Sequence, residues 1–251
     1  MSGGDAPEQR VLNADRISEF YHDNFVADQA RDFGQLVVEK QRPDGVVADV
    51  GGGCGYFAAA ISRDYGVRTR VLDTDPASVA ASRDAGVEAK LFDALAPKFE
   101  GDEEIASFNL ILHHLIGTSD ARTRTLQMRA VETWKEKCRG VFVNEYIYES
   151  PVVAGFSARL IWWVTSSRFL SAIGVVVSRF IPSLRANTFG VGVRFRTAAD
   201  WRGLFQAAGF KVVDYRRGDD EPCSFFRRLM GIRSIRRDSF FLAPVTSQIQ
   251  S

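Results

Sequence analysis

One short stretch limits the fold of this chain more than any other. Val46–Ile61 reads VVADVGGGCGYFAAAI, with four glycines between an apolar strand-like run and an apolar helix-like run. Glycine is needed where the backbone adopts a positive φ or where a ligand approaches too closely for a Cβ atom. A glycine-rich turn from a strand into a helix also points free N–H groups above the sheet, where open α/β sheets bind their ligands. We therefore expect a ligand-binding turn on an α/β sheet.

The residues around this turn alternate between strand-like and helix-like patterns, which is typical of a parallel sheet covered by helices. Short apolar runs predict strands at Val46–Val50, Arg70–Asp73, Ala89–Phe92, Phe108–Leu112, Gly140–Glu145, Phe210–Tyr215 and Asp238–Ala243. Longer amphipathic patterns predict helices over 14–40, Tyr56–Tyr65, Ala77–Ala85, Ala121–Lys137 and from a Thr197 cap to a stop at Gly209. Since no helix of crossover length separates the last two strands, we expect them to pair antiparallel.

Composition places few further limits on the chain. Its residues are 45% hydrophobic and 25% charged, and 32 basic against 31 acidic side chains give a net charge of +1. This composition is typical of a globular protein, and the balanced charge gives no electrostatic reason to expect a nucleic-acid partner. An excess of arginine near the C-terminus fits either a solvated surface or an anionic partner, such as a phosphorylated substrate or a membrane surface. These residues are Arg216, Arg217, Arg227, Arg228, Arg233, Arg236 and Arg237.

The cysteines and the most apolar stretch bear on location. Cys54, Cys138 and Cys223 are widely spaced and odd in number, which supports neither a disulfide framework nor a zinc site. We therefore expect no metal and a reducing, cytoplasmic setting. Arginines interrupt the apolar stretch 158–182, so it is too short between charges to span a membrane. Peripheral contact with a membrane stays open.

The glycine-rich turn is compatible with more than one kind of ligand. A phosphate-binding P-loop requires Gly-Lys-Ser or Gly-Lys-Thr, but Tyr56 follows the last glycine, which excludes that motif. Residues 53–58 match the dinucleotide pattern G-x-G-x-x-A, and Asp73 follows Gly53 by 20 residues, as that pattern requires. A nicotinamide-dependent oxidoreductase therefore stays open, although this interpretation does not use Asp49.

A third interpretation uses every residue of the turn. Asp49–Gly55, DVGGGCG, has the form D-h-G-x-G-x-G and resembles motif I of the Rossmann-like, class I S-adenosylmethionine-dependent methyltransferases. Later segments resemble the same family in order and spacing: VLDTDP around Asp73, LFDAL around Asp93, FNLILHHLIG at 108–117 and FQAAGFKVVDYRR at 205–217. The resemblance implies a seven-stranded, mostly parallel sheet with helices on both faces and an antiparallel last strand. It also implies an N-terminal helical cap and a helical insert after the fifth strand.

The resemblance implies S-adenosylmethionine as the cofactor. This molecule has no phosphate, and it needs a turn without bulk, a carboxylate for two ribose hydroxyls and an acceptor for the adenine amino group. The family places Asp73 at the ribose and Asp93 at the adenine, while Asn109 stands where the family usually has Asp. The cofactor-binding residues that follow from the resemblance are Asp49, Gly51, Gly53, Gly55, Asp73, Thr74, Phe92, Asp93, Leu112 and His113.

The candidate catalytic residues are two histidines and a glutamate. His113 and His114 follow the predicted fourth strand, and a histidine can act as a general base near neutral pH. Asn144 and Glu145 end the predicted fifth strand at the same sheet edge and could orient an acceptor hydroxyl or amine. We take His113, His114 and Glu145 as the catalytic candidates. Packing under the adenine or bonding to the backbone accounts for at least one of the histidines, and pairing with a helix or loop accounts for Glu145 equally well.

The acceptor must be covered by segments outside the shared core. Tyr21 and His22 resemble residues with which this family closes a lid over the cofactor. The insert Pro151–Phe195 is strongly apolar and aromatic, which suits helices packed on the core, a homodimer interface, or a pocket for a ring system, polyketide or lipid tail. The acceptor-binding candidates are Tyr21, His22, Asn144, Trp162 and Trp163.

We expect one methyltransferase domain over residues 1–251. It consists of a helical cap (1–42), a cofactor-binding core (43–148), an apolar substrate or lid insert (149–195) and a C-terminal helix with strands (196–251). The expected activity is methyl transfer to a small-molecule or lipid-like acceptor, at oxygen because the histidines offer a base. The alternatives are N- or C-methylation, nicotinamide-dependent oxidoreduction and a non-catalytic cofactor-binding module.

Overall fold

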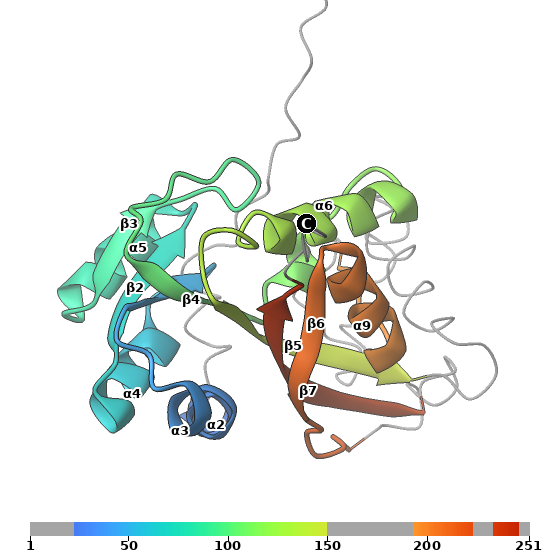
Figure 1. Cartoon of the computed structure of the whole chain (residues 1–251), viewed down its shortest axis with the longest axis horizontal. Helices are drawn as coiled ribbons and strands as arrows, with labels where there is room; N and C mark the ends of the chain where they lie inside the picture. The colour runs from blue at the N-terminus through green and yellow to red at the C-terminus, as the bar shows by residue number, and fades with distance from the viewer. Residues whose placement is uncertain (1–22, 150–192, 223–232, 246–251) are drawn as a thin grey trace, which may run out of the picture.

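A computed structural model of the chain describes residues 23–149, 193–222 and 233–245. Seven strands form one sheet in the order β3-β2-β1-β4-β5-β7-β6, as Figure 1 shows. The strands are β1 (Val46–Val50), β2 (Arg68–Asp73), β3 (Glu88–Leu91), β4 (Glu103–Asn109), β5 (Gly140–Glu149), β6 (Phe210–Arg216) and β7 (Ser234–Pro244). The helices are α2 (Asp23–Phe33), α3 (Glu39–Gln41), α4 (Tyr56–Tyr65), α5 (Pro76–Asp84), α6 (Asp120–Glu132) and α9 (Ala198–Ala207), with a π-turn η1 (Gly34–Val38) and a 3₁₀ turn η2 (Leu112–His114).

The strand directions confirm the predicted fold class. Strands β3, β2, β1, β4 and β5 pair in parallel, whereas β7 pairs antiparallel with both β5 and β6. Strand order reverses between β1 and β4, and such a switch point opens a crevice above the carboxyl ends of the strands. The glycine-rich turn leaves β1 at this crevice.

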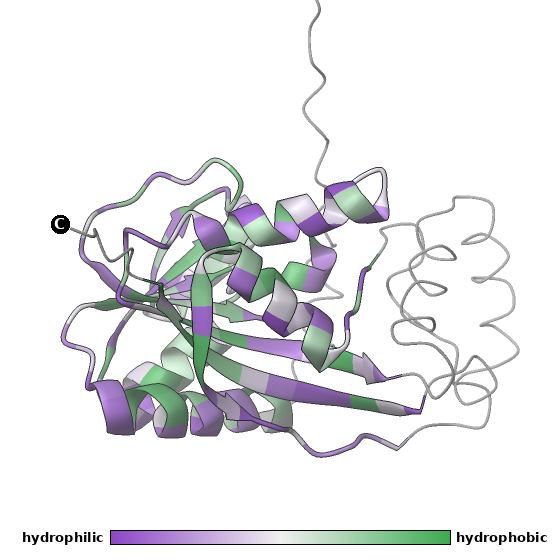
Figure 2. Ribbon diagram, turned by 45° about the vertical axis from the view of Figure 1, so that its right-hand side comes forward, coloured by the Kyte–Doolittle hydropathy of each residue, from purple (hydrophilic) through white to green (hydrophobic). Residues whose placement is uncertain are grey.

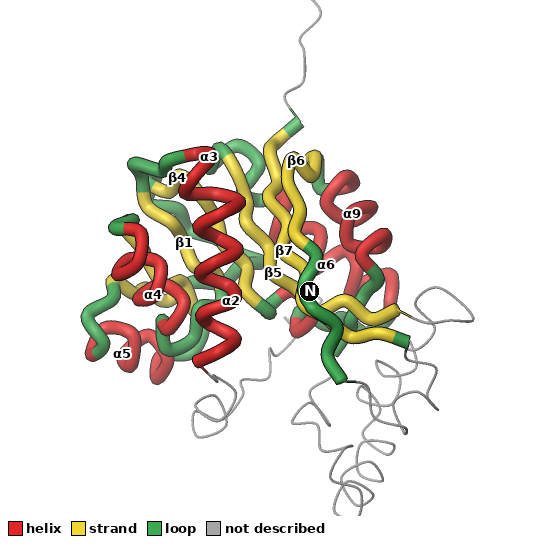
Figure 3. Tube along the Cα trace, turned by 90° about the horizontal axis from the view of Figure 1, so that it is seen from below, coloured by secondary structure: helices red, strands yellow, loops and turns green. Residues whose placement is uncertain are grey.

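Helices cover both faces of the sheet. Residues of α6 and α9 share one apolar cluster with β4 and β5, while α2 and α4 share another with the opposite side of the same strands. Figure 3 shows α2, α4 and α5 in front of the sheet, with α6 and α9 behind or beside it. Hydrophobic and hydrophilic residues alternate along these helices (Figure 2), because each helix turns one side to the sheet.

Aromatic packing fixes α2 against the sheet. The Phe33 ring lies 5.7 Å from the Phe57 ring and 5.3 Å from the Phe142 ring, both edge to face. All three side chains are buried, and burying one phenylalanine contributes about 1.5–3 kcal/mol to stability. The helix that begins the described chain is therefore part of the core.

The structure corrects the predicted fourth strand. Of the predicted strand Phe108–Leu112, only Phe108 and Asn109 belong to a strand, because β4 spans Glu103–Asn109 and Leu110 has a φ of +54°. A left-handed backbone ends the ladder, and the chain turns into η2. Leu112 is nevertheless fully buried, so its apolar side chain extends the strand-like pattern beyond the real strand.

The predicted helix over 14–40 is also corrected in its described part. It is divided into α2, η1 and α3, and Arg42 ends it with a φ of +46°. The π-turn begins at Gly34, where any Cβ atom would collide with the Tyr65 ring of α4. Close approach of α4 thus accompanies the local change in helix geometry.

Several predicted features lie outside the described residues. These are residues 14–22 of the first helix, the apolar stretch 158–182, and the candidates Tyr21, His22, Trp162 and Trp163. Within the described ranges, no helix is long and apolar enough to cross a membrane.

Candidate functional site

The glycine-rich turn presents bare backbone at the switch point. Gly51, Gly53 and Gly55 have φ values of +70°, +54° and +79°, which side-chain-bearing residues rarely adopt. A Cβ atom on Gly51 would lie 2.5 Å from Ile111 Cγ1. Ser82 of α5 donates to the Gly53 carbonyl at 2.8 Å, so the turn is held in place by its neighbours.

Asp73 lies over this turn at the end of β2. Its Oδ2 accepts the Gly53 N–H and its Oδ1 accepts the Asp75 N–H, both at 2.9 Å. Each carboxylate oxygen can accept more than one hydrogen bond. Because Asp73 is half-buried and the next residue, Thr74, is exposed, the oriented carboxylate retains acceptor capacity toward solvent.

Asp49 lies beneath the turn with an unusual set of partners. Asn109 donates through Nδ2 to Asp49 Oδ1 at 3.1 Å and to Ser107 Oγ at 2.8 Å. No group in the described part of the chain donates to Asp49 Oδ2 or Asn109 Oδ1, and both atoms are buried. Burial raises the pKa of Asp49 to about 7; the Asn109 hydrogen bond opposes this rise and the Asp73 charge adds to it. Two orphaned acceptors on a hydrogen-bonded pair of side chains suit a ligand that carries several N–H donors.

The third predicted acid, Asp93, follows β3. It is exposed, and its Oδ1 accepts the Leu95 N–H at 2.8 Å. Its neighbour Phe92 packs inward, with its ring 6.0 Å from that of Trp134. Because parallel strands end at one edge of a sheet, Asp93 lies at the same edge as Asp49 and Asp73.

His113 and Glu145 form a buried pair at this edge. Glu145 Oε2 lies 2.8 Å from His113 Nδ1, and Glu145 Oε1 accepts the Leu112 N–H at 2.6 Å. Glu145 is fully buried and His113 nearly so. A carboxylate at Nδ1 favours the tautomer with the proton on Nδ1, which leaves the Nε2 lone pair available. Glu145 therefore orients the imidazole of His113.

His114 has a different environment from its neighbour. Its ring lies 4.1 Å from that of His113. Burial, followed by the proximity of His113, lowers the pKa of His114 well below its usual value. Within the described chain its Nδ1 has no hydrogen-bond partner. His114 therefore packs beside His113, and its lowered pKa favours the neutral imidazole.

Aromatic side chains pack beside the buried His113 pair. The Phe195 ring lies 5.0 Å from the His113 ring and stacks at 4.3 Å on Tyr148. Tyr146 lies 5.9 Å from His113, edge to face. We call Tyr146, Tyr148 and Phe195 the aromatic wall. Planar rings and apolar surface beside an oriented histidine form a surface suited to an aromatic ligand.

Asn144 does not join the His113 pair. Successive strand residues point to opposite faces, and Asn144 points to the face that α2 covers. It accepts from Gln29 at 3.3 Å and donates to Ser239 at 2.8 Å, and Ser239 in turn donates to Asp32 at 2.8 Å. The structure therefore places this acceptor-binding candidate in a buried network between α2, β5 and β7.

The sequence alone assigns no individual role to several residues of this region, Tyr146 and Tyr148 among them. Phe195 was inside the predicted insert without a role, and Ser82 and Gln127 were inside predicted helices. Gln127 is fully buried and donates to the Leu112 carbonyl at 3.0 Å. A buried glutamine on a helix gives no local signal of its partner, whereas the alternation in NEYIYE does signal that Tyr146 and Tyr148 share a face.

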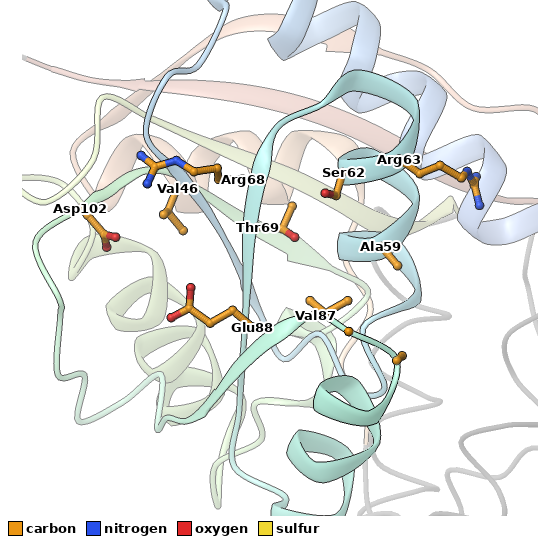
Figure 4. Close-up of a pocket in the computed structure, with 11 residues that line it drawn as sticks. Val46, Ala59, Ser62, Arg63, Arg68, Thr69, Val87, Glu88 and Asp102 are labelled. Carbon is orange, nitrogen blue, oxygen red and sulfur yellow. The ribbon is translucent and has the colours of Figure 1, made fainter.

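A hollow of about 460 Å³ lies elsewhere in the fold (Figure 4). It is bordered by Val46 and Arg68, the first residues of β1 and β2, so it is at the edge opposite the glycine-rich turn. In Figure 4 Arg63 extends away from Glu88 and Asp102. The carboxylates of Glu88 and Asp102 that border the hollow are already paired with Arg70, at 2.6 and 2.7 Å, so this hollow is a weaker candidate for a small-molecule site.

Comparison with known structures agrees with the topology. The mitomycin 7-O-methyltransferase MmcR superposes with a TM-score of 0.54 at 14% identity over 87% of this chain and 53% of that one. The magnesium protoporphyrin IX methyltransferase ChlM from Synechocystis PCC 6803, with bound SAH, has a TM-score of 0.54 at 12% identity over 94% and 89%. The chain has the fold of the class I S-adenosylmethionine-dependent methyltransferases.

Other comparisons limit what this fold establishes. A structure described as a pericyclic reaction enzyme matches with a TM-score of 0.51 at 12% identity, over 86% of this chain and 46% of that one. The chain spans about half the length of MmcR and of this enzyme. No protein-family model and no curated protein matches the sequence. Since one fold hosts many chemistries, the reaction must be argued from the site.

Proposed function

We propose that this protein is an S-adenosylmethionine-dependent methyltransferase that methylates an oxygen of a small, ring-containing or lipid-like acceptor. The observation that carries the proposal is the His113–Glu145 pair, held at the same sheet edge as the glycine-rich turn and the three aspartates. This combination supplies a cofactor cradle and an oriented base together.

The residues of the turn fit the cofactor. Its ribose hydroxyls would donate to Asp73, and its adenine amino group would donate to Asp93. The ammonium of its amino-acid arm would satisfy Asp49 Oδ2 and Asn109 Oδ1, the two orphaned acceptors. Gly51 has no space for a side chain, because a Cβ there would lie 2.5 Å from Ile111 Cγ1, so this part of the turn would meet the arm as bare backbone.

His113 would act as the general base. When bound, the cofactor supplies an electrophilic methyl group, so the protein has to position the acceptor and remove its proton. The acceptor hydroxyl would give its proton to His113 Nε2. Glu145 would hold the Nδ1–H and stabilise the imidazolium, which needs no movement because the 2.8 Å contact already exists.

The aromatic wall indicates which acceptors fit. Phe195, Tyr146 and Tyr148 present ring faces and edges within 6 Å of one another or of His113. An aromatic or other planar acceptor would pack against them and place a ring hydroxyl near His113. This favours a phenolic or polyketide-like hydroxyl over an aliphatic amine.

The topology argues against the oxidoreductase alternative. Dinucleotide-binding folds of the doubly wound type have the strand order 3-2-1-4-5-6, whereas this sheet has a β7 strand inserted antiparallel between β5 and β6. The match to G-x-G-x-x-A is therefore better explained by a cofactor that lacks the pyrophosphate.

Calorimetric titration tests the cofactor part of the proposal. Titration with S-adenosylhomocysteine should give saturable binding, and titration with NAD⁺ or NADP⁺ should give none. The reverse result would exclude methyl transfer and favour oxidoreduction. Incubation with methyl-labelled cofactor and a panel of phenols, each paired with its aniline, then tests oxygen against nitrogen. Cofactor binding with no labelled product from any acceptor, together with sedimentation on liposomes, would favour a non-catalytic membrane-associated module.

A further inference from the structure

The turn that carries His113 is held from a second side. Glu145 accepts hydrogen bonds from backbone N–H groups of the turn, whereas the backbone carbonyl groups of the turn have other partners. The Leu112 carbonyl accepts from Gln127 Nε2 at 3.0 Å, and the His113 carbonyl accepts the Arg194 N–H at 2.9 Å. Gln127 is fully buried on α6. The turn η2 is therefore fixed by β5 on one side and by α6 with Arg194 on the other.

Gln127 connects this turn to the segment Val193–Thr197. Its Oε1 accepts from Arg196 Nε at 2.7 Å. The same segment adds to the sheet edge, because Arg196 forms a parallel bridge with Ile147. It also carries Phe195, whose ring lies 5.0 Å from that of His113. One amide thus contacts both the base-bearing turn and the segment that holds part of the aromatic wall.

Only an amide can make both of these contacts at this position. Its carbonyl oxygen accepts from Arg196 and its NH₂ group donates to Leu112, whereas a carboxylate could accept but not donate. Burial, followed by repulsion from Arg194, lowers the pKa of Arg196 to about 10. A carboxylate at residue 127 would therefore stabilise the charged guanidinium of Arg196 more strongly than the amide does. It would also place a second acceptor against the Leu112 carbonyl, where no donor would remain between the two oxygens.

We propose that Gln127 is a positioning residue for His113: it ties the base-bearing turn to the segment Val193–Thr197, so that the imidazole and Phe195 keep one relative position. The inference rests on the proposed role of His113 as the base. It assigns a function to a residue that touches neither cofactor nor acceptor.

Nuclear magnetic resonance of the histidine rings tests this proposal without any substrate. The chain has three histidines, so ¹⁵N-histidine labelling gives few signals, and His113→Gln assigns the relevant one. The variants are Gln127→Glu, which keeps the contact with Arg196 and loses the donor to Leu112, and Gln127→Met, which loses both. The matched control is Thr125→Ala on the same helix, whose hydroxyl donates to the Ala121 carbonyl of α6 at 3.0 Å.

In the unsubstituted protein and in Thr125→Ala, the His113 signal should show a proton on Nδ1 that exchanges slowly with water. In Gln127→Glu this proton should exchange at least about tenfold faster, the effect of losing roughly one hydrogen bond, and the Nε2–H tautomer should appear. S-adenosylhomocysteine affinity should stay within about twofold, because Gln127 bonds to the Leu112 carbonyl and to none of the glycines or acids of the cofactor cradle within the described residues.

Unchanged His113 signals in a folded Gln127→Glu protein would overturn the proposal. Loss of tertiary structure in Gln127→Glu would also overturn it, because it would show that Gln127 supports the fold rather than the histidine. If Gln127→Met unfolds but Gln127→Glu does not, the His113 signals of the folded Gln127→Glu protein test the proposal. A chain that binds no S-adenosylhomocysteine but shows the expected His113 signals would refute the proposed function and leave this inference intact.

Discussion

Glu145→Gln separates orientation of His113 from every other property of the site. The glutamine side chain has nearly the volume of the glutamate. Its carbonyl oxygen can still accept the Leu112 N–H, which lies 2.6 Å from Glu145 Oε1 in the unsubstituted protein. Its NH₂ group then faces His113 Nδ1, where the carboxylate oxygen lies at 2.8 Å. An amide donor there requires an unprotonated Nδ1, so the proton moves to Nε2. The variant should therefore hold the imidazole in place in the wrong tautomer.

The expected effects differ in size for stability and for turnover. Glu145 accepts from Leu112, His113 and Tyr146, and exchanging hydrogen bonds to a charged group for neutral ones costs about 1–3 kcal/mol in total. Removing the general base lowers turnover by about 10²–10⁴-fold. Cofactor binding should be nearly unchanged, because Glu145 does not contact the glycine-rich turn.

Three measurements check this prediction: histidine ¹⁵N resonance for the tautomer, urea unfolding for stability and methyl-label incorporation for turnover. Glu149→Gln is the matched control, because Glu149 ends the same strand and pairs with Arg236 at 3.4 Å. A persistent Nδ1–H on His113 in Glu145→Gln would refute the orientation argument. A normal tautomer shift with unchanged turnover would instead refute the role of His113 as the base.

Three further predictions concern the cofactor cradle. Gly51→Ala should abolish S-adenosylhomocysteine binding in calorimetry and destabilise the fold by more than about 1 kcal/mol, whereas Gly66→Ala, with a similar φ of +68° but nothing within 4 Å, should leave binding intact; equal affinities would contradict the close-approach argument. Asp73→Ala should weaken binding by about 1–3 kcal/mol through lost hydrogen bonds, and unchanged affinity would remove its ribose role. The pKa of Asp49, raised to about 7 by burial, lies above that of the unfolded chain, so its contribution to stability is present in acid and is lost as the pH rises through 7. Affinity for the cofactor's ammonium should rise over the same interval, and Asp49→Asn should remove both pH dependences; affinity independent of pH between 5.5 and 8.5 in the unsubstituted protein would exclude this carboxylate as the partner.

The sequence located the cofactor edge because the signals there are local. The predicted bounds of Val46–Val50 and Tyr56–Tyr65 are those of the structure. The glycine-rich turn marks both, because the apolar strand ends where the turn begins and the amphipathic helix begins where the turn ends. The Thr197 cap was also confirmed, with its hydroxyl accepting the Asp200 N–H at 3.0 Å. Such features depend on residues within a few positions of one another.

The fourth strand shows where this reasoning fails. Leu112 is as apolar as a strand residue, but Leu110 takes a left-handed φ and its N–H donates to the Asn144 carbonyl of the neighbouring strand. Hydropathy predicts that Leu112 is buried, but it does not predict the backbone conformation that places it there. The strand's end was therefore set by a contact with β5 that no local pattern contains.

By itself, the sequence determined the strand, the glycines and the order of the aspartates, because backbone conformation and short spacing are encoded by adjacent residues. Only the tertiary structure decided that Glu145 faces His113 while Asn144 faces α2, because the two faces of a strand become distinct only when its neighbours pack. It also brought Gln127 of α6, and Phe195 and Arg196 of the segment Val193–Thr197, to the histidine turn. The glycine-rich turn is thus encoded by consecutive residues, whereas the environment of the proposed base is produced by the packing of β5, α6 and Val193–Thr197 around η2.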